Sequence, residues 1–287
     1  MTEHEQYFFD VNGYLVIEDM LSAEMVSEMN SAFDNAGGQQ VKLREGDLRL
    51  AGDSGKLAGR HGRGDTGLLM QWPEPWCQPF RQLLTHHRTL RIMLDLIGPG
   101  FRHSSADGIT MDRGAEGLNL HGSASTLDVR SSSGYQCQNG VMANGLVTVM
   151  YQLADINAGD GGLVVIPGSH RASFALPADV KEMEAREDWF HEVPVKKGSA
   201  IVFTEATTHG TKPWRGDHQR RTLLYRYAHG AINHFSSAAD GADPDTYAPL
   251  RAQMSPLGQA VLEPPHGGKR PNILALVEEE AAEGGRA

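Results

Sequence analysis

Cysteine is scarce in this chain of 287 residues: only Cys77 and Cys137 are present, and they share no motif. Without a Cys-x-x-Cys pair, neither a zinc knuckle nor a disulfide framework is indicated. Two free thiols are typical of a reducing compartment. The first residues, MTEHEQYFFD, also lack the basic and apolar stretches of a signal peptide. We therefore expect a cytoplasmic protein.

Long apolar runs and positive charge are also in short supply. No apolar stretch approaches the roughly 18 residues of a membrane span, so we expect no membrane partner. The chain has 26 Lys and Arg against 36 Asp and Glu, a formal net charge of -10. This balance argues against binding to a nucleic acid polymer, which needs a basic surface. A small anionic substrate in a local basic pocket remains compatible with it.

Glycine, by contrast, is abundant, with 33 residues. From about residue 101, short apolar runs such as GLVTVMYQLAD and GGLVVIPGSH are separated by Gly, Asn and Asp, which predicts a sandwich or barrel. Residues 147–152 alternate in polarity as in a half-buried strand. Ser22 is placed to cap a helix that continues to about residue 33, and a second helix is predicted over 78–97.

These patterns predict one domain over residues 1–287 of a mainly β fold. We expect a double-stranded β-helix, that is, a jelly roll of the cupin type, with N-terminal and peripheral α-helices. The helical elements occupy about 1–100, the jelly-roll core about 101–230, and an irregular C-terminal segment 231–287. No internal repeat or linker divides the chain.

Three residues organise the β half. His121 follows an apolar run, His209 follows the predicted strand over 200–204, and Arg220 comes 11 residues after His209. Together with DVNGYLVIEDMLS near the start and DINAGDGGLVVIPGSHR in the middle, this spacing resembles the phytanoyl-CoA dioxygenase family of Fe(II)/2-oxoglutarate oxygenases. The resemblance extends from about residue 6 to residue 230.

The resemblance implies that His121 and His209 bind iron and that Arg220 binds 2-oxoglutarate. The chemistry agrees, because non-haem iron that activates O2 is held by a few protein ligands with positions left open. Arginine meets a carboxylate through two parallel hydrogen bonds. Arg221 and Arg226 are rivals for the anchor, and along a strand only Arg226 shares the face of Arg220. Gln138 and Thr222 are further candidates for cofactor binding.

Ser123 departs from the family pattern, which has His-x-Asp where this chain has His-Gly-Ser. The carboxylate can come from elsewhere, from Asp128 first or from Glu205; the iron can be absent; or the position can be open to chloride. The last arrangement resembles the 2-oxoglutarate-dependent halogenases, where a small residue replaces the carboxylate. It is the one we favour, with Ser123 beside the chloride in the catalytic site.

The predicted function is therefore halogenation of an unactivated aliphatic carbon, with Fe(II), 2-oxoglutarate, O2 and chloride. The alternatives are a hydroxylase with a displaced carboxylate ligand and a jelly-roll binding module without iron. Trp214 and Asn144 are candidates to contact substrate, although packing at the rim and turn formation explain them as well. Four arginines occupy the Gly-rich segment 36–70, and they favour an anionic small molecule such as a nucleotide: Arg44, Arg49, Arg60 and Arg63.

Overall fold

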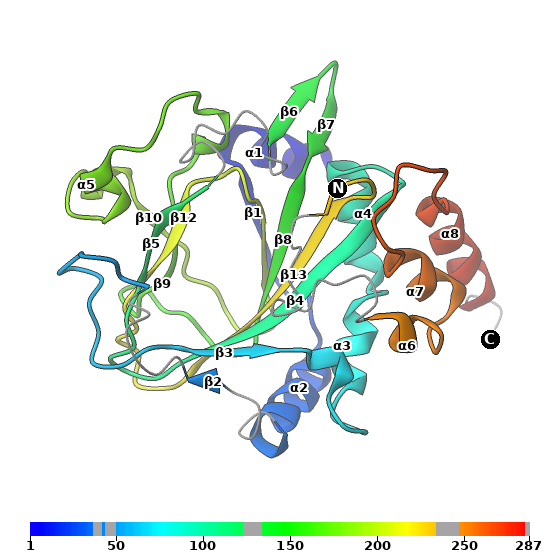
Figure 1. Ribbon diagram of the computed structural model, residues 1–287, viewed down its shortest axis with the longest axis horizontal. Coiled ribbons are helices and arrows are strands. Elements are labelled where there is room, and N and C mark those ends of the chain that lie inside the picture. The colour runs from blue at the N-terminus through cyan, green and yellow to red at the C-terminus, as the bar shows by residue number, and fades with distance from the viewer. Residues whose placement is uncertain (37–41, 44–49, 123–133, 234–246, 285–287) are drawn as a thin grey trace.

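The computed structural model describes residues 1–36, 42–43, 50–122, 134–233 and 247–284 (Figure 1). Two antiparallel sheets and a separate ribbon are formed by these residues. The larger sheet has the order β1 (Tyr14–Ile17), β11 (Ala200–Thr204), β8 (Leu146–Gln152), β13 (Arg220–His229), β4 (Phe101–Met111), β3 (Gly64–Gly67) and β2 (Lys42–Leu43). The smaller sheet has the order β10 (His191–Glu192), β9 (Gly162–Val165), β12 (His209–Lys212) and β5 (Leu118–His121).

The ribbon consists of β6 (Tyr135–Gln138) and β7 (Val141–Asn144), and it projects from the body beside α1 (Figure 1). The helices are α1 (Glu3–Asn12), α2 (Ala23–Asn35), α3 (Gln78–Leu83), α4 (His87–Leu96), α5 (Ala178–Lys181), α6 (Ala248–Arg251), α7 (Pro256–Val261) and α8 (Ile273–Gly284). Short 3-10 turns lie at η2 (Leu69–Gln71), η4 (Ser169–Arg171) and η5 (Glu187–Trp189). This arrangement confirms the predicted double-stranded β-helix with peripheral helices.

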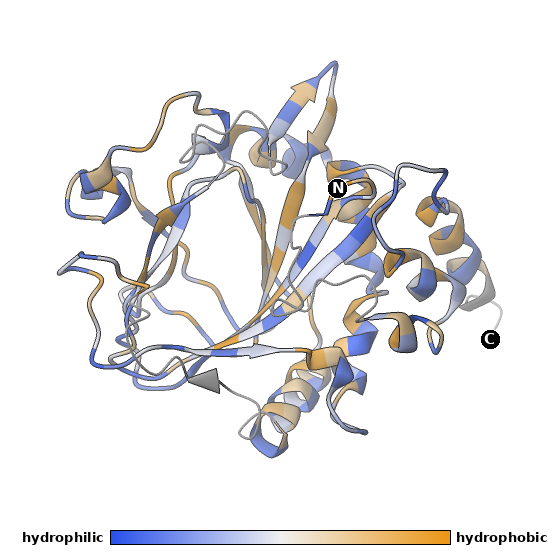
Figure 2. Cartoon of the chain, in the orientation of Figure 1, coloured by the Kyte–Doolittle hydropathy of each residue, from blue (hydrophilic) through white to orange (hydrophobic). Residues whose placement is uncertain are grey.

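The larger sheet has two different faces because side chains alternate along each strand. Val147, Val149 and Tyr151 of β8 face outward and join the helices in the main core, together with Phe33 and Leu90. Figure 2 shows that β8 is apolar over much of its length, whereas β4 and β13 carry polar stretches. The predicted alternation of faces over 147–152 is confirmed, but the strand is not half-buried: every residue of β8 is buried, because its opposite face lines the interior between the two sheets.

The interior has its own apolar lining, distinct from the helix-covered core. Met111 of β4, Met150 of β8, Phe203 of β11 and Leu224 of β13 belong to one buried cluster with Val165 of the smaller sheet. Both sheets therefore contribute to the same enclosed space. Polar side chains two positions from these apolar ones, such as Thr148 and Gln152 on either side of Met150, share the same face of the strand and point into that space as well.

An extra residue interrupts the pairing of β4 with β13. Arg226 pairs with Ser105, but the next residue, Tyr227, pairs with His103, so that Ser104 is left without a register partner. This is the signature of a β-bulge. Because of it, His103 lies among tyrosines on the outer face, while Ser105 and Asp107 are turned toward the interior, where both contact Arg226.

Two predictions about the helices were wrong. The helix predicted over 78–97 is divided into α3 and α4, because His86 has an extended backbone and its side chain accepts a hydrogen bond from the Thr89 N–H as an N-cap. The segment 231–287 is not irregular, since it contains α6, α7 and α8. Leu257 and Val277 of these helices are buried in the main core. No helix in the described part of the chain is long and apolar enough to cross a membrane.

Candidate functional site

Two histidines face one another across neighbouring strands of the smaller sheet. His121 at the end of β5 is the register partner of His209 at the start of β12, and their ring centroids are 4.2 Å apart. Nδ1 of His121 donates to the Asn119 carbonyl at 3.1 Å, and Nδ1 of His209 donates to the Thr207 carbonyl at 2.8 Å. These hydrogen bonds leave both Nε2 atoms as lone-pair donors, the form that binds a metal.

Gly122, which directly follows His121, lies close to Thr207, whose carbonyl accepts the hydrogen bond from Nδ1 of His209. A Cβ built on Gly122 would lie 2.9 Å from the Thr207 carbonyl oxygen, so a larger residue would push the two segments apart. Burial and the neighbouring His209 lower the pKa of His121 to about 4. The His121 imidazole is therefore neutral near pH 7, as a metal ligand must be.

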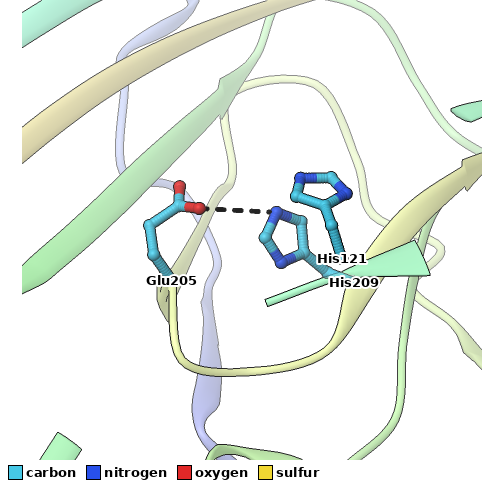
Figure 3. A group of neighbouring side chains, drawn as sticks. All are labelled: His121, Glu205 and His209. Atoms are coloured by element: carbon cyan, nitrogen blue, oxygen red, sulfur yellow. Dashed lines mark ion pairs between the residues drawn. The ribbon is translucent and has the colours of Figure 1, made fainter. Parts of the chain in front are cut away.

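A carboxylate faces the histidine pair from the loop between β11 and β12. Oε2 of Glu205 lies 3.6 Å from Nε2 of His209, and Figure 3 shows the carboxylate directed toward the imidazole rings. One potential ligand atom from each of His121, His209 and Glu205 lies within 4.8 Å of the other two. Burial alone would raise the pKa of Glu205, but His209, Arg226 and Thr148 outweigh it and lower the pKa.

The other oxygen of Glu205 is already engaged. Thr148 of β8 donates its hydroxyl to Oε1, and Nε of Arg226 lies 3.8 Å from the same oxygen. Arg226 in turn forms an ion pair with Asp107 and donates to the Ser105 hydroxyl at 3.3 Å. Burial would lower the pKa of Arg226, but Asp107 and Glu205 raise it, so the guanidinium stays charged.

Arg220 is a buried cation of a different kind. Its side chain is fully buried, and among the described residues its η nitrogens approach two thioether sulfurs, Met111 Sδ at 3.1 Å and Met150 Sδ at 3.8 Å. Its Nε has no hydrogen-bond partner among the described residues. Burial, and then the nearby Arg63, lower the pKa of Arg220 to about 9. A buried guanidinium without a carboxylate is a ready receptor for one.

Arg220 and the group of His121, His209 and Glu205 line the same interior between the two sheets. Met111 and Met150, which contact Arg220, belong to the interior cluster that also contains Phe203 and Val165. The Phe203 ring lies 4.7 Å from that of His209, and Val165 is the register partner of His209. Two imidazoles and a carboxylate fit a divalent iron ion, and Arg220 fits the free carboxylate of a 2-oxo acid. The donor set and the fold define the class of non-haem iron, 2-oxoglutarate-dependent oxygenases.

Comparison with known proteins gives the family. The model of the phytanoyl-CoA dioxygenase (PhyH) family matches residues 9–222, so the chain belongs to this family of Fe(II)/2-oxoglutarate-dependent oxygenases. No curated protein matches the sequence.

Solved structures of low sequence identity share the fold. HygX from Streptomyces hygroscopicus, solved with nickel, 2-oxoglutarate and hygromycin B, is 20% identical with a TM-score of 0.66, over 82% of this chain and 90% of HygX. The carbocyclase SnoK from nogalamycin biosynthesis is 17% identical with a TM-score of 0.59, over 94% of each chain. The epimerase SnoN from nogalamycin biosynthesis is 17% identical with a TM-score of 0.57, over 80% of this chain and 83% of SnoN.

The remaining predicted site residues are distributed differently. Thr222 is buried two residues after Arg220 on the same strand and therefore faces the interior as Arg220 does. Its hydroxyl donates to Gln152 Oε1 at 2.7 Å. Arg63 lies near enough to affect both His121 and Arg220 electrostatically, and its Nε donates to Asp65 at 2.9 Å. The roles predicted for Thr222 in cofactor binding and for Arg63 in substrate binding stay predictions.

Four other candidates lie apart from the histidine pair or are committed to packing. Gln138 is exposed on the projecting ribbon, and Arg60 is exposed as well. Asn144 donates its side-chain amide to the Leu96 carbonyl at the end of α4, away from the interior. Trp214 is fully buried in the interior cluster, and its indole N–H donates to the His218 carbonyl at 2.7 Å. Ser123, Asp128, Arg44 and Arg49 lie outside the described residues.

Sequence reasoning ranked Glu205 behind Asp128 and did not identify Thr148 or Asp107. The period-two pattern over 146–152 contained a signal for Thr148, because it placed this residue on the face opposite Val147 and Val149. No comparable signal existed for Asp107, because the bulge at Ser104 reverses the alternation within β4.

Proposed function

We propose that this chain is an Fe(II)- and 2-oxoglutarate-dependent oxygenase that hydroxylates an aliphatic carbon of a small soluble molecule. The observation that carries the proposal is that His121, His209 and Glu205 come together in the same interior that holds a buried Arg220, which has no carboxylate partner among the described residues. Hydroxylation is preferred to chlorination because a carboxylate faces the two histidines, which gives the two-histidine, one-carboxylate set.

In this proposal, iron bound by the three side chains supplies the oxidising chemistry with O2 and 2-oxoglutarate. Arg220 binds the distal carboxylate of 2-oxoglutarate, with Met111 and Met150 beside its aliphatic part. The Asn119 and Thr207 carbonyls hold the imidazoles in the metal-binding tautomer. The apolar interior excludes water, which strengthens the charged contacts.

An anionic substrate such as a nucleotide remains the preferred class. Arg63 is the candidate for its anion, since this side chain is mostly buried and lies near both His121 and Arg220. Because Asp65 accepts from Arg63 at 2.9 Å, an incoming anion would compete with that carboxylate. Adenosine monophosphate is a direct probe, because it should stimulate 2-oxoglutarate turnover in the native protein and not in an Arg63→Gln variant.

The test of the reaction class starts with anaerobic titration. Fe(II) and 2-oxoglutarate together should give a visible metal-to-ligand charge-transfer band, and O2 should then yield succinate. Absence of the band would refute the proposal and favour a binding module without iron.

Chlorination is the second candidate, favoured by Ser123 in the place where the family has a carboxylate. It predicts that chloride changes the charge-transfer band of the native protein and leaves that of a Ser123→Asp variant unchanged. Hydroxylation through Glu205 predicts a band that does not respond to chloride in either protein.

A further inference from the structure

We infer that Glu205 binds the iron through Oε2 alone, and that Arg226 is the positioning residue that holds its other oxygen. The inference rests on the proposed function and specifies how the displaced carboxylate works. It concerns residues on two strands and one loop: β8, β13 and the loop that precedes β12.

The strand register brings the required groups together. Arg226 of β13 is the register partner of Thr148 of β8 and of Ser105 of β4. Thr148 is also the register partner of Phe203, whose ring contacts His209. Since partners in a register row lie on the same face, Thr148, Arg226 and Phe203 form one row along the inner face, level with the histidines.

The Glu205 backbone is fixed beside this row. Its N–H donates to the Leu146 carbonyl at 3.0 Å, at the start of β8. From this position the carboxylate meets Thr148 and Arg226 with Oε1 and is directed toward His209 with Oε2. The two oxygens therefore have different roles, and only Oε2 remains for a ligand on the histidine side.

The approach of Oε2 to His209 needs a positive charge between the two atoms. Nδ1 of His209 donates to a carbonyl, so Nε2 is the ring nitrogen that faces the carboxylate 3.6 Å away. Two lone pairs opposed at that distance repel each other unless a proton or a cation lies between them. A metal ion held by both Nε2 atoms and Oε2 removes that repulsion.

Arg226 is suited to a fixed role because Asp107 and Ser105 hold it from the other side. A partner that orients a ligating carboxylate commonly contributes 10- to 100-fold to metal affinity. A guanidinium shared by Glu205 and Asp107 also prevents Glu205 from turning both oxygens toward the metal.

The experiment compares Glu205→Gln, Arg226→Met, Arg226→Lys and Thr148→Val with the native protein. Readouts are the Co(II) visible spectrum, which reports coordination number, and the anaerobic dissociation constant of Fe(II). The matched control is Arg221→Met, because Arg221 is the outward-facing arginine on the same strand and pairs with Asp34. Thermal melting checks that each variant is folded.

We expect Glu205→Gln to raise the Fe(II) dissociation constant about 100-fold and to change the Co(II) spectrum. Arg226→Met should raise the constant about 10-fold, Arg226→Lys should restore most of the loss, and Thr148→Val should have a smaller effect. Arg221→Met should bind as the native protein does.

The failures are distinguishable. A native protein without the Fe(II)–2-oxoglutarate band refutes the proposed function itself. A native band together with unchanged Fe(II) binding by Glu205→Gln overturns the assignment of Glu205 and leaves the chlorination candidate in place. If Glu205→Gln loses the metal but Arg226→Lys and Arg226→Met bind it equally to native protein, Arg226 has no positioning role.

Discussion

At the scale of single residues, Arg220 can be tested most directly. Its surroundings suit a guanidinium that is paired with a bound carboxylate better than one that is not. A buried cation beside two sulfurs keeps much of its desolvation penalty, since thioethers are weak acceptors. Bound 2-oxoglutarate would remove that penalty. Ligand binding and folding stability are therefore linked at this residue.

We expect Arg220→Met to bind 2-oxoglutarate on the order of 100-fold more weakly, because it loses a buried charge pair. The same change should raise the melting temperature of the ligand-free protein, since an uncompensated buried charge disappears. Thermal melts with and without 2-oxoglutarate measure both effects. Arg221→Met serves as the control and should retain the shift caused by 2-oxoglutarate. A variant at residue 220 that binds 2-oxoglutarate normally would refute the assignment.

At the scale of elements, the turn between α1 and β1 supports the strand that carries His209. Gly13 ends α1 with φ of 79°, and its carbonyl accepts from the Thr207 hydroxyl at 2.9 Å. The Thr207 carbonyl in turn accepts from Nδ1 of His209. A Cβ at Gly13 would lie 2.3 Å from Thr207 Oγ1 and 2.5 Å from His170 Nδ1, so this position admits only glycine.

Gly13→Ala should lower the free energy of unfolding by roughly 2–4 kcal/mol, because backbone strain and steric overlap add. It should also weaken Co(II) binding through displacement of Thr207. Gly98→Ala is the matched control, since Gly98 has φ of 103° but open space at the Cβ position, so only strain of about 1 kcal/mol is expected. Urea unfolding and Co(II) titration check both variants. Equal losses for the two would show that the contact with Thr207 is unimportant.

The elements also show how far the sequence could be interpreted. Ser22 predicted the start of α2, and the alternation over 147–152 predicted both faces of β8, because both signals are local. The spacing of His209 and Arg220 predicted the two halves of the candidate site, and their roles stay predictions. The division at His86 could not be foreseen, because an N-cap histidine breaks no hydrophobic pattern.

The carboxylate proposed as the third metal ligand could be found only from the tertiary structure. Separation along the chain favoured Asp128, seven residues after His121, over Glu205, yet the fold directs Glu205 toward the histidines from another loop. Residues far apart in sequence meet where β8, β11 and β13 run side by side, and a single sequence holds no measure of that proximity. The preference for chlorination, based on Ser123, stays a prediction.

At the scale of the whole molecule, the sheet and the C-terminal part of the chain meet around a buried histidine. His103 is 1% exposed, and the rings of Tyr225, Tyr227 and Tyr247 pack edge-on against it. Burial, and then Arg102 and Arg226, lower the pKa of His103 to about 3. An unfolded chain would hold this proton up to a pH of about 6.5.

The unfolded state therefore binds more protons than the folded state between those two values, and stability falls as the pH drops from about 6.5 toward 3. Between pH 7 and pH 4.5 we expect the native protein to lose on the order of 2–3 kcal/mol more than His103→Phe, whose ring keeps the tyrosine contacts. Urea unfolding of both proteins at the two pH values measures the difference. Parallel losses would mean that His103 takes up its proton without unfolding.

The bulge at Ser104 has a further consequence for comparing this chain with its relatives. It allows the odd-numbered side chains of one continuous strand to face the outer side before the bulge, as His103 does, and the interior after it, as Ile109 and Met111 do. If a relative without this bulge were aligned with β4 without a gap, residues on one side of Ser104 would be matched to residues that face the opposite side of the sheet. Substrate preferences transferred by alignment across this strand would then compare side chains that face different sides of the sheet.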